Sequence, residues 1–146
     1  MDEGASTKLF LKDKKVQISF HCQDTVEEVV YDENEEYQDE EPILPLRFTV
    51  TVSKAGKKLV LECMSELGQA KVVGVSTASS DSAEEDMYQG PDFFELAEDL
   101  QESFAIYLDE ECAVTSDVAT FVAMYADYKE QMQYVQFLKD AKSIIE

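Results

Sequence analysis

The sequence is poor in the residues on which most catalytic and metal-binding sites depend. Its 146 residues include one histidine, three cysteines, five glycines, three prolines and no tryptophan. Cys22, Cys63 and Cys112 are widely spaced and form no Cys-x-x-Cys pair, which excludes a zinc finger and favours buried, reduced thiols. The scattered glycines form no phosphate-binding loop. We therefore expect no cofactor and no bound metal ion.

Histidine is also too scarce for common nucleophilic catalysis. A serine or cysteine nucleophile usually needs a histidine base, and the single histidine, His21, is adjacent to Cys22 in a segment of alternating polarity. Adjacent residues of a strand point to opposite faces, so these two side chains cannot readily pair. Carboxylates are abundant, but no pair is distinguished from the others. The sequence predicts a protein that is not an enzyme, and carboxylate catalysis is the least favoured alternative.

Basic residues are few. Twelve Lys and Arg face 32 Asp and Glu, which gives a net charge of −20 at pH 7. This balance argues against direct nucleic-acid binding and against docking on anionic lipid, and it favours a cationic partner. No uncharged apolar run approaches the roughly 20 residues of a membrane-spanning helix. The acidic segment Met1–Gly4 resembles neither a secretory signal nor a transit peptide.

The acidic residues are concentrated in two regions. From Val72 to Tyr128 there are fourteen acids and no base, and nine of the fifteen residues from Glu27 to Glu41 are acidic. We predict two acidic loops, at 24–41 and 77–90, that attract basic proteins; a merely solubilising surface is the alternative. The predicted partner-binding acids are Glu27, Glu28, Asp32, Glu33, Glu35, Glu36, Asp39, Glu40, Glu41, Asp81, Glu84, Glu85 and Asp86.

The first acidic loop contains a partial calcium-binding pattern. Asp32, Asn34 and Glu36 have the alternate spacing of an EF-hand start. However, Tyr37 occupies the glycine position and Ile43 the last ligand position, which excludes an EF-hand. Weak, diffuse binding of divalent cations remains an alternative to simple counterion screening.

The first two thirds of the chain have the period-two pattern of strands, over about residues 8–95. The clearest strand alternates Leu46, Phe48, Val50 and Val52 with polar residues, and turns are expected at 13–15, 53–58 and 65–69. A further strand is expected near Gly90-Pro91. Short strands joined by polar turns indicate an antiparallel meander.

The remaining chain has a helical period, which predicts helices at about 97–111 and 117–145. A single α+β domain over 1–146 follows. One sheet covers only one face of the long second helix, so we expect an oligomer contact on its other face; a helix covered entirely by its own sheet is the alternative. The residues expected in helix packing or oligomer contact are Phe121, Tyr125, Tyr128, Met132, Val135, Leu138 and Ile145.

The C-terminal half resembles the mitochondrial acidic matrix protein family, also called the mitochondrial glycoprotein family, whose animal member is the receptor for the globular heads of a complement component. The matching segments are Tyr88-Gln89-Gly90-Pro91-Asp92-Phe93, Leu100-Gln101, Tyr107-Leu108-Asp109-Glu110, Tyr125, Lys129-Glu130-Gln131, Tyr134-Val135, Phe137-Leu138-Lys139 and Lys142-Ser143-Ile144. The order of strands, acidic loops and two helices also agrees.

The resemblance implies a strongly twisted antiparallel sheet of about seven strands with two C-terminal helices packed on it. It further implies a homotrimer in the mitochondrial matrix, without enzymatic activity. Such proteins are chaperone-like adaptors for basic partners, among them ribosomal and RNA-processing proteins, and support mitochondrial translation and respiration. A structural assembly protein that docks its partner through the long helix is the alternative.

This sequence departs from the family pattern at three places. Glu111-Cys112 replaces a common Arg-Gly, and Phe137 stands where tryptophan is frequent. The family also has a helix ahead of the first strand, whereas only about seven residues precede Leu9 here. We therefore expect that helix to be missing or trimmed.

Overall fold

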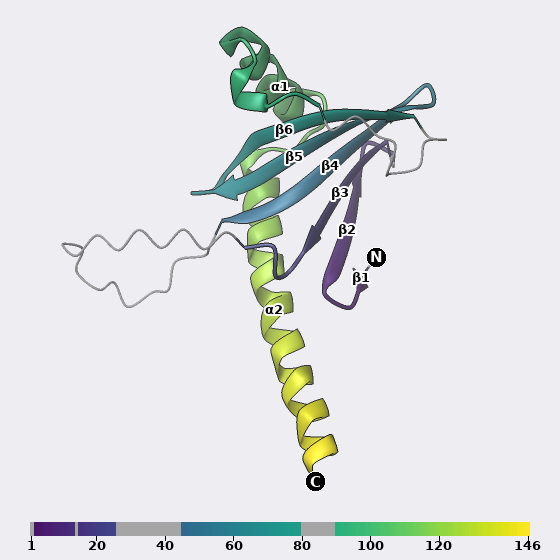
Figure 1. The fold of residues 1–146 in the computed structure, drawn as a ribbon, viewed down its shortest axis with the longest axis vertical. Coiled ribbons are helices and arrows are strands. Elements are labelled where there is room, and N and C mark those ends of the chain that lie inside the picture. Colours follow the sequence, from purple (N-terminus) through teal and green to yellow (C-terminus); the bar gives the residue numbers. More distant parts are fainter. Residues whose placement is uncertain (1, 14, 26–44, 80–89) are drawn as a thin grey trace, which may run out of the picture.

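The fold is a six-stranded antiparallel sheet with two helices on one face (Figure 1). The computed structural model describes residues 2–13, 15–25, 45–79 and 90–146. In chain order the elements are β1 (Asp2–Glu3), β2 (Ser6–Leu11), β3 (Val16–His21), β4 (Leu46–Lys54), β5 (Lys57–Glu66), β6 (Gln69–Ser79), the 3-10 helix η2 (Phe93–Glu95), α1 (Glu98–Glu110) and α2 (Ser116–Ile145).

The strands form a meander in which each strand pairs with the next, and tight turns join β4 to β5 and β5 to β6. Ala55 and Gly56 join β4 to β5 with φ angles of 50° and 76°, and Leu67 and Gly68 join β5 to β6 with 52° and 75°. Two residues with positive φ match the right-handed strand twist that a two-residue hairpin requires. The turns predicted within 53–58 and 65–69 are confirmed.

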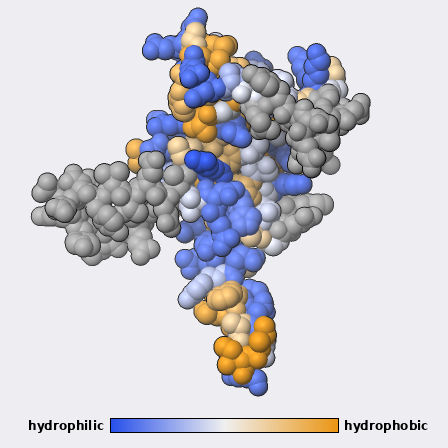
Figure 2. Space-filling model, in the orientation of Figure 1, coloured by the Kyte–Doolittle hydropathy of each residue, from blue (hydrophilic) through white to orange (hydrophobic). Residues whose placement is uncertain are grey.

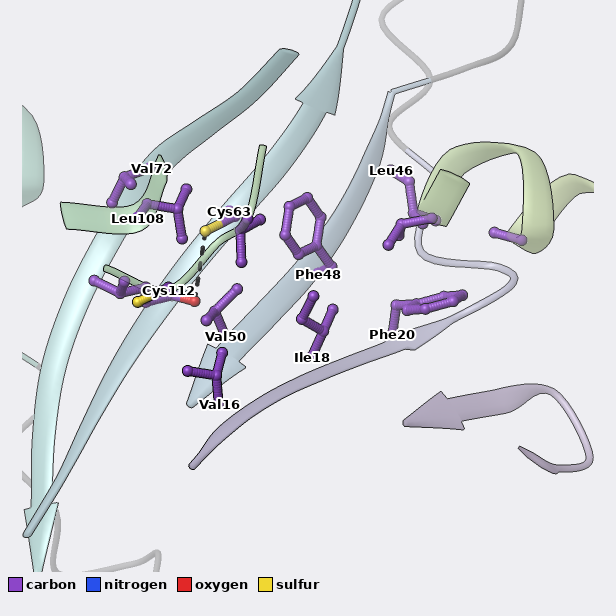
Figure 3. Packing of buried hydrophobic residues seen from close by; sticks show 14 of the residues in the cluster. Val16, Ile18, Phe20, Leu46, Phe48, Val50, Cys63, Val72, Leu108 and Cys112 are labelled. Atoms are coloured by element: carbon purple, nitrogen blue, oxygen red, sulfur yellow. Dashed lines mark hydrogen bonds between the residues drawn. The ribbon is translucent and has the colours of Figure 1, made fainter. Parts of the chain in front are cut away.

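The core lies between the inner face of the sheet and the two helices (Figure 3). Alternate residues of β3 and β4, among them Ile18 and Val50, are fully buried, as the period-two pattern predicts. They pack in one cluster with Leu108 of α1 and with Val122 of α2. The sheet and the C-terminal helices therefore share one hydrophobic core.

The helices agree closely with the predicted ranges. The Thr115 side chain caps α2 by accepting a hydrogen bond of 3.5 Å from the backbone N–H of Val118. The first half of α2 lies along the sheet, and its C-terminal half extends beyond the sheet edge (Figure 1). None of the described helices combines the length and hydropathy needed to cross a membrane.

The strand region differs from the prediction in detail. The described residues form six strands, one of them only two residues long, so the expected seven are not confirmed. The strand expected near Gly90-Pro91 is wrong after the proline, because Phe93–Glu95 forms η2, capped by Asp92. The second acidic loop was predicted to begin at 77, but β6 continues to Ser79 through its pairing with β5. Among residues 2–13 there is a strand pair and no helix.

Candidate protein-binding surface

The acids predicted to bind partners in the two loops lie outside the described residues. These are Glu27, Glu28, Asp32, Glu33, Glu35, Glu36, Asp39, Glu40, Glu41, Asp81, Glu84, Glu85 and Asp86. The partial calcium pattern within 32–43 lies there as well. Their roles stay predictions, and the described acidic surface has to be built from other residues.

The described acids are densest on and around α1. We call this the α1 acidic surface, and every member of it is exposed: Asp92, Glu95, Glu98, Asp99, Glu102, Asp109, Glu110 and Glu111. No lysine or arginine occurs between Val72 and Tyr128. None of these residues was among the predicted partner-binding acids, although they all lie within the acidic run from Val72 to Tyr128.

The position of α1 explains why these carboxylates face water. Leu108 is buried and Phe104 and Tyr107 are partly buried against the core, which leaves the rest of the helix circumference outside. None of the acids forms an ion pair with another described residue. The field that they generate is therefore not neutralised within the described part of the chain.

Charge placement on α1 is unfavourable for helix stability at one end. Asp109 and Glu110 lie in the last turn, and no basic residue accompanies them there. The C-terminal end of a helix carries partial negative charge, so these carboxylates are repelled by the helix dipole. The acidity of this end does not serve the stability of the helix, which favours a role in intermolecular contact.

Large apolar side chains occur among the acids. Phe94, Leu100 and Ile106 are 67%, 43% and 48% exposed. A surface that combines carboxylates with apolar side chains can hold a partner that is both cationic and amphipathic.

The second surface of interest is the outer face of α2. Ala119, Val122 and Ala126 lie buried against the sheet, and Tyr125 is partly buried against the core, while most other large apolar side chains of α2 are exposed. Beyond Gln131 no residue of α2 is buried in the chain, and the C-terminal end of the helix is strongly apolar (Figure 2). Of the predicted packing residues, Tyr125 is partly buried against the core, and the others form an uncovered apolar face: Phe121, Tyr128, Met132, Val135, Leu138 and Ile145.

An aromatic series links this face to the core. Tyr125 meets buried Phe20 edge-on with ring centroids 6.3 Å apart, and it stacks on Phe121 at 5.7 Å. Tyr128, which is 59% exposed, follows at 6.3 Å from Tyr125. The expectation that the sheet alone cannot cover α2 is consistent with this arrangement, whereas what covers the face stays a prediction.

One side chain that sequence reasoning missed attaches α2 to the sheet. Lys129 is buried, and its Nζ donates to Thr7 Oγ1 at 3.2 Å and to the Ser6 carbonyl oxygen at 3.3 Å. A lysine within a run of surface-type residues gives no sequence signal for burial, because its partners precede it by more than 120 residues.

The described thiols and the histidine are placed for structural roles. Cys22, Cys63 and Cys112 are buried and free. Burial raises the pKa of Cys63 to about 12, which disfavours the nucleophilic thiolate. His21 accepts a 3.0 Å hydrogen bond at Nδ1 from the backbone N–H of Gln23. Among the described residues no group of acids, histidines and cysteines could hold a metal ion.

Comparison with known proteins agrees with this architecture. A hypothetical protein from Leishmania major, described as a sequence homologue of the human p32 protein, superposes with a TM-score of 0.72 at 16% identity over 98% of this chain and 78% of its own. The Trypanosoma brucei p22 protein gives a TM-score of 0.65 at 21% identity over 97% and 75%. At these identities the two structures establish the fold alone.

Sequence similarity extends over almost the whole chain. The family model described as mitochondrial glycoprotein matches residues 5–145. Membership in this family suggests a mitochondrial location and an acidic, protein-binding role, in a family that is generally non-enzymatic. Because the match spans residues 5–145, the chain belongs to the mitochondrial glycoprotein family.

Proposed function

We propose that the protein is a non-enzymatic, chaperone-like adaptor of the mitochondrial matrix that binds basic proteins. In this role it supports mitochondrial gene expression, through RNA processing and translation, and respiration. The observation that carries the proposal is the α1 acidic surface, whose carboxylates are exposed and lack ion-pair partners among the described residues. Ribosomal and RNA-processing proteins, which are rich in Lys and Arg, are the class of partner that such a surface attracts.

The mechanism is electrostatic attraction followed by weak, reversible contact. Fields of this kind raise association rates with cationic partners and are screened over roughly 8 Å at physiological salt. Each exposed carboxylate contributes little by itself because it stays hydrated. Binding therefore depends on the number of acids rather than on one pair, which suits an adaptor with several partners.

A partner-binding test can separate local contact from overall charge. Glu98→Gln, Glu102→Gln and Asp109→Asn remove three charges from the α1 acidic surface. The matched control, Asp140→Asn with Glu62→Gln and Asp127→Asn, removes three charges from exposed positions on β5 and α2. The partner is a fluorescent 20-residue lysine-rich amphipathic peptide, measured by anisotropy at 50 and 300 mM NaCl.

We expect the wild-type affinity to fall at least about tenfold between the two salt concentrations, since the Debye length shrinks over this range. At 50 mM the α1 variant should bind at least about threefold more weakly than the control. Binding that does not respond to salt, or equal losses in both variants, would contradict the proposed surface.

We further propose that three copies associate through the uncovered apolar face of α2. Large exposed apolar patches mark interaction surfaces, and three linked acidic surfaces would add avidity for basic partners. Light scattering should give three times the 16.5 kDa of one chain. Val135→Asp with Leu138→Asp should dissociate the assembly, whereas Gln131→Asp with Lys139→Asp should not. A wild-type mass of one chain would refute this part of the proposal.

The same uncovered face favours a second candidate function. A structural assembly protein would dock one specific partner through Tyr128 and Val135, which are 59% and 48% exposed. Its binding would be insensitive to salt and to the three α1 substitutions, and it would be lost on replacing either apolar residue. Affinity capture from mitochondrial extract at two salt concentrations distinguishes the two functions.

A further inference from the structure

The chain has a basic end that contrasts with its overall charge. Half of its twelve basic residues occur in two short segments, 12–15 and 54–58, and these are Lys12, Lys14, Lys15, Lys54, Lys57 and Lys58. In a meander, alternate turns return to the same end of the sheet, so the β2–β3 and β4–β5 turns lie together. The backbone N–H of Ser53 donates to the Lys15 carbonyl oxygen at 3.0 Å, and Val16 pairs with Val52.

The charges of this basic end are not compensated by nearby acids in ion pairs. The five lysines described here are exposed, and none forms an ion pair with another described residue; Lys71 and Lys142 make the ion pairs found there. Lys54 and Lys57 are direct cross-strand partners. Like charges placed opposite each other destabilise a hairpin, so the clustering opposes stability.

A hollow lies between the two turns and the end of α1. Its volume is about 530 Å³, which falls within the range of small-molecule sites. Val16 and Val52 line it together with Ser53 and Tyr107. Five of its lining residues are ionisable: Lys12, Lys15 and Lys54 are basic, and Asp13 and Glu111 are acidic.

We propose that this hollow binds a small phosphorylated molecule of nucleotide size. Lysine ammonium groups are donors that bind phosphate oxygens, and three exposed lysines line this one hollow. The carboxylates of Asp13 and Glu111 repel phosphate but accept hydrogen bonds from sugar hydroxyl groups. A ligand with a phosphate end and a hydroxyl-bearing end can bind both the basic and the acidic groups. A basic peptide, in contrast, would be repelled by the lysines.

The overall charge selects the size of the ligand. A long polyanion would extend over the acidic remainder of a chain with a net charge of −20 and be repelled by it. A small ligand stays within roughly 8 Å of the lysines, where their field is least screened at physiological salt. The hollow shares only Glu111 with the α1 acidic surface, and none of the test substitutions replaces that residue, so loss of ATP binding and loss of peptide binding can be told apart.

The test uses the full chain and ATP without divalent cations. Calorimetry should give saturable binding to one site per chain, and NMR should show shifts of the Lys15 and Ser53 amides. Lys12→Gln with Lys15→Gln and Lys54→Gln should weaken binding at least about tenfold, because hydrogen bonds to charged groups are lost. The matched control has the same net charge, but its substitutions lie outside the hollow: Lys57→Gln, Lys58→Gln and Lys71→Gln. It should retain the ATP affinity within about twofold.

Two results would overturn the site. One is the absence of saturable ATP binding at millimolar concentration, and the other is an equal loss in the two triple variants, which would reduce the effect to general electrostatics. All six substituted lysines are exposed, and each variant replaces one member of the opposed Lys54–Lys57 pair, so neither unfolding midpoint should fall below that of the wild type. If ATP does not bind, the affinity for the lysine-rich peptide should still be as expected for the acidic adaptor.

Discussion

The contact of Lys129 with β2 gives a stability prediction that can be worked out from the structure. Its Nζ donates to Thr7 Oγ1 and to the Ser6 carbonyl oxygen, and the Thr7 side chain is almost fully buried at 1% exposure. Lys129→Met keeps the length of the side chain but removes the donor. A hydrogen bond to a charged group contributes about 1.5–3 kcal/mol, and a buried oxygen left without a donor costs about 1–3 kcal/mol.

The lost hydrogen bond and the buried oxygen left without a donor are two descriptions of the same change, so their costs are not added. We expect the variant to lower the free energy of unfolding by about 2–3 kcal/mol. Urea denaturation followed by circular dichroism at one protein concentration measures it. Lys139→Met, on the exposed part of the same helix, is the control and should change the free energy by less than about 0.5 kcal/mol.

A double variant tests the cause. Adding Thr7→Val to Lys129→Met removes the stranded hydroxyl, so the pair should recover about 1 kcal/mol relative to Lys129→Met alone. The reasoning is refuted if Lys129→Met stays within about 0.5 kcal/mol of the wild type, or if the second substitution adds a further, fully independent loss.

Two further predictions concern other buried groups. Burial raises the pKa of the Cys63 thiol from 9.0 to about 12, so the unfolded chain loses this proton at lower pH than the folded chain does. The free energy of unfolding should therefore fall as the pH rises from 9 to 12, by up to about 1.4 kcal/mol per pH unit. Urea titrations at pH 8 and 10.5 should show a smaller fall for Cys63→Val, and an unchanged fall would contradict the assignment. Gly90 has a φ of +81°, and a Cβ there would clash with the Val75 carbonyl oxygen, so Gly90→Ala should lower the unfolding free energy by more than about 2 kcal/mol. Gly56→Ala, at φ +76° with open space around it, should cost only about 1 kcal/mol, and equal costs would argue against the contact.

Secondary structure was largely predictable because its signals are local. The helices predicted at 97–111 and 117–145 are observed at Glu98–Glu110 and Ser116–Ile145. Alternation over Leu46–Val52 predicted β4 and its buried face. The errors arose where pairing or capping overrides the pattern, as in the extension of β6 alongside β5 and in η2 after Pro91.

Sites were less predictable than elements. The acidic run between Val72 and Tyr128 indicated the charge of the α1 acidic surface, but α1 packing decides which of its residues face water. The same limit applies to α2, where the apolar stripe was evident and its inner and outer sides were not. Ala119, Val122, Ala126 and Lys129 are buried against the sheet, whereas most of the large apolar side chains lie outside.

Composition and periodicity by themselves determined the acidic character, the α+β class and the helical segments, since these depend on charge counts and on neighbours within a few residues. Only the tertiary structure decided that Lys129 is buried beside Thr7 and that Lys12, Lys15 and Lys54 line one hollow. Those groups are far apart along the chain, and only the closing of the meander and the docking of the helices bring them within contact distance.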